Sequence, residues 1–305
     1  MSVYAEIPVV FASWRQFVLL LLTFLCVTSG NSVLADEPTL LGSETCGSST
    51  CHNAAEPWMN SAVNQNEYVI WRDRDPHARA WRTLQSEDAR NIAGYFGIED
   101  PASSAQCLGC HTTQIGLGGH ESAFDIRNGI SCEACHGAAS KWLGVHSAGL
   151  YFYDRNIAAG MYPTADPEKR AEICVSCHVG TPDSYITHEM MAAGHQAPSF
   201  QMNFHTWFKP DSVDTYTDYA HFEIDDDYLQ RKPVPFGLKA LLVGEIVQWR
   251  QFLTIIESEY SEMLGIFPEL AFFDCYSCHF QAYDAGGPVI DGPGVRDTSA
   301  LPLPC

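Results

Sequence analysis

Five segments of the chain place a histidine directly after a pair of cysteines, and this repeated motif constrains the fold more than any other feature. Two residues separate the cysteines in four of the motifs, and four residues separate them in the fifth. In chain order the motifs consist of Cys46, Cys51 and His52; Cys107, Cys110 and His111; Cys132, Cys135 and His136; Cys174, Cys177 and His178; and Cys275, Cys278 and His279. The chain holds 12 cysteines and 12 histidines, and a random chain of this composition would contain roughly 0.02 strings of the form Cys-x-x-Cys-His. The repeat therefore serves one specific chemistry.

Covalent attachment of haem explains this spacing. Two thiols on one turn can add to the two vinyl groups of a haem, while the adjacent imidazole reaches the iron. A structural zinc site needs four ligands and gives no reason for a histidine after every cysteine pair. Thioredoxin-like pairs occur singly, and disulfides would leave the histidines unexplained. We predict five covalently attached c-type haems, held by the ten motif cysteines, with the five motif histidines as iron ligands. The longer first motif demands a wider loop, which must still close on His52.

The five irons need five further axial ligands, which we expect among the remaining histidines. The candidates are His77, His146, His188, His195, His205 and His221. His77 follows Asp75 and Pro76, which suit the cap and first turn of a helix that we expect to run to about Asn91. Because spare histidines are plentiful, histidine on both sides of the iron is simpler than methionine ligation.

The segment around His188 and His195 is predicted to form one helix, with Gly194 near its end. Seven helical residues rotate by about 700° and rise by about 10.5 Å, so the two imidazoles would point the same way, two turns apart. They would then serve different haems. His205 and His221 follow in an aromatic stretch, and if they are not ligands they could supply protons in an enzyme.

The N-terminal segment has the pattern of a secretory signal. An apolar run over 17–27 follows Arg15, and small residues precede a cleavage site after Ala35. The run is short for a membrane-spanning helix, and an uncleaved anchor is the alternative. We expect residues 1–35 to be a signal peptide, and the mature chain to be periplasmic or otherwise extracytoplasmic without stable membrane insertion.

The rest of the chain predicts a mainly α fold. Residues 36–285 would form the pentahaem domain, with about 54 residues for each haem, so short helices and loops would wrap around stacked haems. One long helix is expected at about 238–264, where apolar residues recur at 238, 242, 246, 249, 253, 256, 260 and 263. We interpret this stripe as an internal packing face, with a dimer contact as the alternative. Residues 286–305 form a Gly/Pro-rich tail, which ends in Cys305, a cysteine without an assigned role.

The net charge of the chain limits the classes of partner that it can bind. It holds 17 basic and 37 acidic residues, for a net charge of -20, which disfavours nucleic acid and anionic membranes. Haem propionates add further negative charge, so we expect redox partner proteins with a basic docking surface.

The order and the residue sequences of the motifs resemble those of a known family. The resemblance is carried by the long first motif, Arg74-Asp-Pro-His-Ala-Arg79, Cys107-Leu-Gly-Cys-His111, Gly129-Ile-Ser-Cys-Glu-Ala-Cys-His-Gly137, Cys174-Val-Ser-Cys-His-Val-Gly180, His188-Glu-Met-Met-Ala-Ala-Gly-His195 and the stretch from Phe267 to His279. Over roughly residues 40–282, this pattern is similar to multihaem cytochromes c with a cytochrome c-554/c-552-type domain. The resemblance implies a helical fold with stacked haem pairs, a periplasmic setting and electron transfer, in some relatives linked to nitrogen or sulfur oxyanion chemistry.

Two functions follow from the sequence. The first is a pentahaem cytochrome that transfers electrons between redox partners, since the spare histidines outnumber the open iron positions. The alternative is a multihaem oxidoreductase that acts on a small nitrogen or sulfur compound at one five-coordinate haem. No motif replaces its histidine with lysine, which disfavours the pentahaem nitrite reductases.

Overall fold

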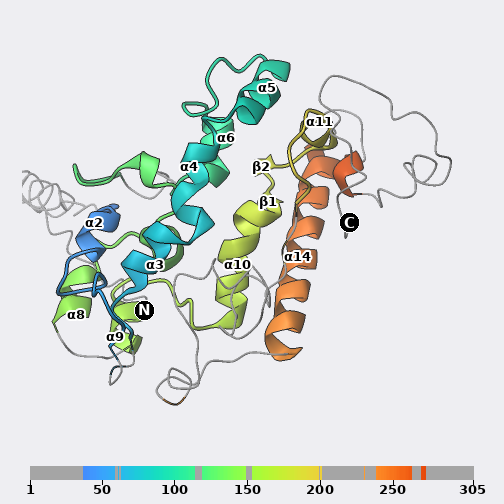
Figure 1. The fold of residues 1–305 in the computed structure, drawn as a ribbon. Helices are drawn as coiled ribbons and strands as arrows, with labels where there is room; N and C mark the ends of the chain where they lie inside the picture. The colour runs from blue at the N-terminus through green and yellow to red at the C-terminus, as the bar shows by residue number, and fades with distance from the viewer. Residues whose placement is uncertain are drawn as a thin grey trace, which may run out of the picture. The chain divides into compact units, whose positions relative to one another are not determined.

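The structure is a computed structural model, and it is mostly helical (Figure 1). It describes residues 37–58, 61, 63–113, 119–148, 153–198, 200, 230, 238–262 and 269–272. By their contacts the residues form two units, Met1–Glu37 and Pro38–Cys305, and all the elements below belong to the second. The predicted signal peptide, the tail, His205, His221 and the motif of Cys275, Cys278 and His279 lie outside the described residues.

The described helices are short, except for the long helix α14. The helices are α2 (Ser43–Cys46), α3 (Glu67–Asp73), η1 (Pro76–Arg79), α4 (Ala80–Thr83), α5 (Glu87–Tyr95), α6 (Ala105–His111), η2 (Ile126–Asn128), α7 (Cys132–His136), α8 (Leu143–Ser147), α9 (Tyr153–Ala158), α10 (Pro167–His178), α11 (His188–Ala192), α14 (Leu238–Glu262) and η4 (Leu270–Phe272). Two-residue strands β1 (Gly180–Thr181) and β2 (Ser184–Tyr185) pair antiparallel. In the part of the chain described, the fold is mainly α, as predicted.

The helix expected from Asp75 to about Asn91 is interrupted, so that prediction is wrong in part. The Asp75 carboxylate caps the start by accepting from the His77 backbone N–H at 3.0 Å. After α4, however, Ser86 starts α5 by accepting from the Ala89 N–H at 3.1 Å. A serine followed by two acidic residues is a strong helix start, and here it takes precedence over the continuing helical pattern.

The largest described core lies between α10 and α14, which run side by side (Figure 1). It contains Ala171, Val175, Val179, Phe200, Ala240, Val247 and Ile255. Arg250 of α14 joins the two helices by donating to Glu168 at 2.9 Å and to Glu172 at 2.7 Å. These contacts fix α10, the helix that carries Cys177 and His178.

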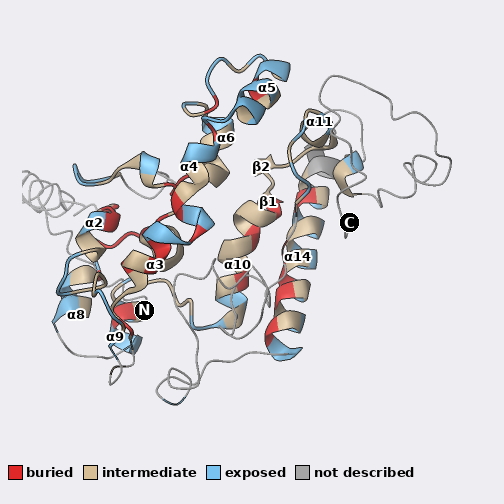
Figure 2. Cartoon of the chain, viewed as in Figure 1, coloured by how far each residue is buried: buried red, intermediate tan, exposed pale blue. Residues whose placement is uncertain are grey.

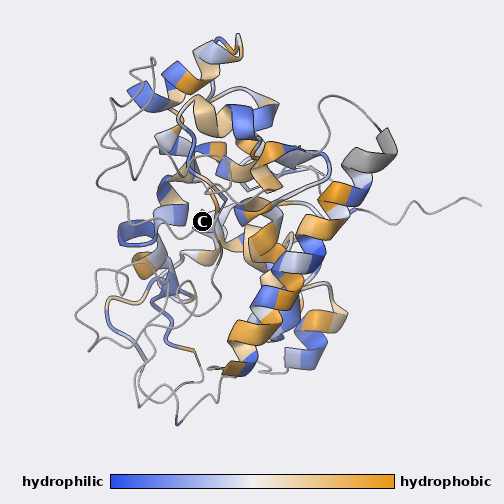
Figure 3. Ribbon diagram, turned by 90° about the vertical axis from the view of Figure 1, so that its right-hand side faces the viewer, coloured by the Kyte–Doolittle hydropathy of each residue, from blue (hydrophilic) through white to orange (hydrophobic). Residues whose placement is uncertain are grey.

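The apolar stripe on α14 does not face this core, so the packing interpretation is wrong for its first five members. Leu238, Leu242, Ile246, Trp249 and Leu253 are 51–70% exposed, and Figure 2 shows exposed segments at intervals along α14. In Figure 3, hydrophobic bands recur along the whole length of this helix. The buried face uses smaller residues such as Ala240, Gly244 and Val247. Small side chains allow two helices to approach closely, which explains why the larger residues lie outside.

Candidate haem-binding sites

The described motif cysteines are all free thiols, as haem attachment requires. They are Cys46, Cys51, Cys107, Cys110, Cys132, Cys135, Cys174 and Cys177, and each is partly accessible. A disulfide within a motif would consume the two thiols that must add to the haem vinyl groups. The thiols of the four described motifs therefore remain available for attachment.

Three of the motifs end a helix, and this places their chemical groups on one face. His111, His136 and His178 are the last residues of α6, α7 and α10. The two cysteines of each motif are three residues apart and the histidine is four residues after the first, so all three share a helix face. One planar group can therefore meet both thiols and the imidazole.

In the first motif, a closed loop brings the histidine back to its cysteines. α2 ends at Cys46, and the His52 backbone N–H donates to the Cys46 carbonyl at 3.2 Å. Gly47 allows this loop to lie against the Tyr68 ring, because a Cβ at position 47 would come within 2.6 Å of that ring. The four intervening residues therefore still bring His52 back to its cysteines.

Cys51 lies outside the helix, in the wider loop that the longer first motif was predicted to need. Because α2 ends at Cys46 and Gly47 follows as its cap, Cys51 belongs to a separate turn. Its backbone N–H donates to the Ser48 carbonyl at 2.9 Å, and its Sγ lies 3.8 Å from the Thr50 hydroxyl. The longer spacing thus places Cys51 on a loop rather than on the helix face that the other motifs use, and its assignment to haem attachment stays a prediction.

Thiols of different motifs lie side by side. Cys46 hydrogen-bonds to Cys132, which lowers the pKa of Cys46 and raises that of Cys132. In the same way Cys110 hydrogen-bonds to Cys177, and this bond lowers the pKa of Cys177 to about 7. The first motif is thus adjacent to the third, and the second to the fourth.

Three motif histidines face a second histidine at nearly the same distance. The ring centroids are 6.0 Å apart for His52 and His146, 6.1 Å for His77 and His178, and 6.4 Å for His111 and His195. An imidazole nitrogen binds a metal at about 2 Å, and the ring centre lies about 1.1 Å behind that nitrogen. Two imidazoles on opposite sides of one iron would therefore have centroids about 6.3 Å apart. The three pairs have the spacing that a six-coordinate haem iron requires.

The hydrogen bonds of these rings leave the outer nitrogen available for iron. Nδ1 of His52 donates to Glu67 at 2.8 Å, and Nδ1 of His77 donates to Asp75 at 2.9 Å. Nδ1 of His111 donates to the Ala80 carbonyl at 2.9 Å. Carboxylates and carbonyls accept hydrogen bonds, so the proton sits on Nδ1 and the Nε2 lone pair is available.

The same partners set the pKa values of the rings. The hydrogen bond with Glu67 raises the pKa of His52. Burial lowers the pKa of His77, but the hydrogen bond and the charge of Asp75 outweigh it and the net shift is upward. For His111 and His146 burial dominates and lowers the pKa. A lowered pKa keeps an imidazole neutral, which is the form that binds metals.

His146 is held by aromatic and amide neighbours. The buried Trp142 packs edge-on against it with centroids 5.6 Å apart, and the Asn156 side-chain amide lies 3.3 Å from Nδ1. The Asn156 carbonyl oxygen has no hydrogen-bond partner as placed. A half-turn of this amide would bring the oxygen to Nδ1, where it can accept from Nδ1–H.

The remaining predicted ligands have different surroundings. His136 ends α7, and its backbone carbonyl accepts from the Tyr162 N–H at 2.8 Å. His188 begins α11, where its backbone N–H donates to Glu269 at 2.8 Å. α11 ends at Ala192, and Gly194 has a φ of 110°. His195 therefore lies beyond the helix, and the prediction that it points the same way as His188 from one continuous helix is wrong.

The comparisons with known proteins match part of the chain to one family. A family model described as "Cytochrome c554 and c-prime" matches residues 45–137. Residues 45–137 therefore resemble the cytochrome c554 family. The chain is also 28% identical over 166 residues to cytochrome c-554 of Nitrosomonas europaea, a match that covers 50% of this chain and 63% of that relative. No solved structure matches.

The similarity to this family points to covalently bound c-type haem as the cofactor. The residues fit that group, because three motifs place their cysteines and histidine on one helix face and the paired imidazoles have the required spacing. Among the described residues, no three His, Cys, Asp or Glu side chains converge as a site for a metal ion alone.

Two acidic residues of the candidate sites were not predicted from the sequence. Glu67 lies 15 residues after His52, and nothing in the spacing links them. Glu133 lies inside the third motif, is 2% exposed, and accepts from the backbone N–H groups of Leu41, Gly42 and Ala139 at 2.8–2.9 Å. Its position between the two cysteines of that motif was visible in the sequence, but its partners about 90 residues away were not.

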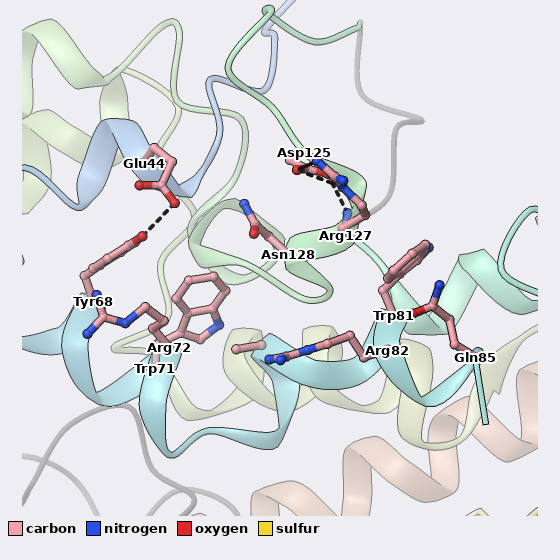
Figure 4. Close-up of a pocket in the computed structure, with 11 residues that line it drawn as sticks. Glu44, Tyr68, Trp71, Arg72, Trp81, Arg82, Gln85, Asp125, Arg127 and Asn128 are labelled. Atoms are coloured by element: carbon pink, nitrogen blue, oxygen red, sulfur yellow. Dashed lines mark hydrogen bonds and ion pairs between the residues drawn. The ribbon is translucent and has the colours of Figure 1, made fainter.

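A pocket of about 430 Å³ is lined by residues of α2, α3, η1, α4 and η2 (Figure 4). Its lining includes Trp71, Trp81 and Arg82, together with Glu44 and Tyr68, whose hydroxyl donates to Glu44 at 2.7 Å. None of the predicted cofactor or metal residues lines it, but Ala78, which directly follows His77, does.

Proposed function

We propose that the chain is an extracytoplasmic pentahaem cytochrome c that transfers electrons between redox partners. The observation that carries this proposal is the set of three histidine pairs, each joining a motif histidine to one predicted distal histidine at 6.0–6.4 Å. An iron with histidine on both sides has no open position for a substrate, so its chemistry is limited to gaining and losing an electron.

In this proposal His146, His77 and His195 are the distal ligands for the haems of His52, His178 and His111. The ten motif cysteines hold the haems covalently, and His136 and His279 bind the other two irons. His188, His205 and His221 remain the proposed sources of the two remaining distal ligands. When bound, each haem supplies a one-electron redox centre, and the protein sets its potential through ligands, hydrogen bonds and burial.

The adjacency of the motif thiols supports close contact between haems. Cys46 touches Cys132, and Cys110 touches Cys177, so the attached haems would form neighbouring pairs. Neighbouring haems give an electron a short path through the protein. A partner with a basic surface suits the net charge of -20, and complex formation with it should weaken as salt screens the charges.

For location, the predicted signal supports export, and the structure has no described helix that is long and apolar enough to cross a membrane.

The test is to purify the mature protein from a host that attaches haem c, and to count haems by intact mass and by pyridine haemochrome absorbance. The proposal expects five haems, N-terminal cleavage after Ala35, and ferric EPR spectra dominated by low-spin iron. A large high-spin fraction combined with turnover of a nitrogen or sulfur oxyanion would instead support the oxidoreductase alternative. Fewer than five haems would overturn the count.

Replacing Glu67 with glutamine should raise the reduction potential of the haem on His52. The Glu67 carboxylate accepts from Nδ1 of His52, which makes the imidazole a stronger donor and favours ferric iron. A neutral amide removes that charge, and a tenfold change in the redox equilibrium corresponds to about 60 mV for one electron. Spectroelectrochemistry should show one haem shifted upward by about this amount. The control is Glu121→Gln at an exposed position, and equal titrations of wild type and Glu67→Gln would contradict the assignment.

A further inference from the structure

The three histidine pairs differ in the charge of the groups that accept hydrogen bonds from their Nδ1 atoms. His52 donates to the Glu67 carboxylate at 2.8 Å, and His77 donates to the Asp75 carboxylate at 2.9 Å. Asp75 is buried and Glu67 is partly buried, so water screens their charges less than at an exposed site. Two of the three pairs therefore have a carboxylate charge directly behind one ligand.

The pair of His111 and His195 has neutral acceptors behind both rings. His111 ends α6, which packs against α4, and its Nδ1 donates to the Ala80 carbonyl of α4 at 2.9 Å. Nδ1 of His195 donates to the Gln196 carbonyl at 2.8 Å. A peptide carbonyl has a dipole but no net charge, so it polarises an imidazole less than a carboxylate does.

Thr83 lies beside the hydrogen bond of His111. Its hydroxyl donates to the same Ala80 carbonyl at 2.6 Å, and the hydroxyl oxygen lies 3.1 Å from Nδ1 of His111. An oxygen of residue 83 is thus within hydrogen-bonding distance of the ligand. The side chain at this position decides whether that oxygen is neutral or charged.

We propose that the haem on His111 has the highest reduction potential of the three paired haems, and that Ala80 and Thr83 are positioning residues that keep it high. The inference rests on the proposed function, which assigns the haems and their ligands. A negative charge behind a ligand stabilises ferric iron, which carries one more positive charge than ferrous iron, and so lowers the potential. The haems on His52 and His178 each have one such charge, whereas both described acceptors of the His111 pair are neutral.

This ranking gives electron transfer a direction within the protein. Cys110 hydrogen-bonds to Cys177, so the haems on His111 and His178 would be neighbours. An electron that a reducing partner protein delivers to the iron of His178 moves on to the iron of His111. The first iron is oxidised and the second is reduced by one electron, no bond forms or breaks, and Nδ1 keeps its proton. An oxidising partner protein would therefore take electrons from the haem of the second motif.

A redox titration followed by EPR ranks the haems in the holoprotein. His195→Ala, His146→Ala and His77→Ala should each convert one low-spin haem to high-spin iron, which identifies the component of that haem in the wild-type titration. The component lost in His195→Ala should have the highest midpoint, about tenfold or more above the other two in the redox equilibrium, which is about 59 mV for one electron. An equal or lower midpoint would overturn the ranking. If His195→Ala left every haem low-spin, the ligand pairing of the proposed function would be wrong, and the ranking would fall with it.

Thr83→Asp tests the neutral acceptor directly. It places a carboxylate beside Nδ1 of His111 and should lower the midpoint of that haem by about threefold or more in the redox equilibrium, which is about 28 mV for one electron. Solvent screens part of this charge, because Thr83 is exposed. The control is Thr83→Asn, which has nearly the same shape without the charge and should stay within about 1.5-fold of wild type.

The two variants separate a charge effect from a structural one. A purely structural role of Thr83 would shift the midpoint of both variants alike, whereas a charge effect shifts that of Thr83→Asp alone. The visible spectrum and the helical circular dichroism of both variants report folding. Equal midpoints for folded Thr83→Asp and Thr83→Asn would overturn the proposal.

Discussion

Replacing His146 with alanine should convert one haem from low-spin to high-spin iron while the others stay low-spin. His146 faces His52 with ring centroids 6.0 Å apart, so the proposed haem on His52 would lose its sixth ligand. The Soret band should shift to the blue in part, and a ferric high-spin EPR signal should appear with the intensity of one haem. Added imidazole should bind the open position and restore the low-spin spectrum.

The angles between the paired rings make this prediction specific to one haem. The planes of His52 and His146 differ by 13°, whereas those of the other two pairs, His77 with His178 and His111 with His195, differ by 87° and 84°. Near-parallel ligands separate the two iron d orbitals that overlap with them and give a rhombic low-spin signal. Perpendicular ligands leave these orbitals close in energy and give a strongly axial one. His146→Ala should therefore remove a rhombic signal and keep the axial ones.

The control for this experiment is His120→Ala. His120 is exposed, its ring lies 5.3 Å from Phe124, and it was not predicted to be a ligand. This variant should leave every EPR signal unchanged. If His146→Ala also left the spectrum unchanged, His146 would not be an iron ligand and the centroid spacing would have another cause.

The motif cysteines and histidines were predictable, because covalent haem attachment fixes their spacing along the chain. A haem needs two thiols and a histidine close together on the chain, so the motif residues can be read from the sequence. The distal candidates His77, His146 and His195 could be proposed because several irons needed partners. Asp75 lies two residues from His77, and its hydrogen bond is a local consequence of the helix start.

The pairings were not predictable, because they depend on contacts between distant segments. His146 follows the third motif by ten residues but faces His52 of the first. His77 faces His178, about 100 residues later. No local rule distinguishes these pairings from others, since tertiary packing decides which helices meet.

The faces of α14 show the same limit for the fold. Its apolar periodicity predicted a helix, and α14 is found there, but Leu242 and Trp249 are exposed whereas Ala240 and Gly244 are buried. Hydrophobicity alone favours burial of leucine and tryptophan. The close contact with α10 instead selects alanine, glycine and valine, and this depends on a partner helix that the pattern of α14 does not contain.

Replacing Glu133 should cause the largest loss of stability among single changes in the described part of the chain. The side chain is 2% exposed, and it accepts from three backbone N–H groups, those of Leu41, Gly42 and Ala139. Buried N–H groups without an acceptor cost about 1–3 kcal/mol each. Glu133→Ala should therefore lower the free energy of unfolding by about 3–5 kcal/mol. Glu133→Gln keeps one oxygen but turns an NH₂ group toward the donors, and should cost about 2–3 kcal/mol.

The loss should be measured by urea unfolding of the holoprotein, followed by circular dichroism, with Glu121→Gln as the control. Glu121 is exposed, so that change should stay within about 0.5 kcal/mol. Because Glu133 fixes the segment before α2 to the third motif, Glu133→Ala should also expose the Cys46 region to proteolysis before global unfolding. Equal stability of Glu133→Ala and Glu121→Gln would mean that water replaces the carboxylate as the acceptor. The buried carboxylate would then not be what joins the first motif to the third.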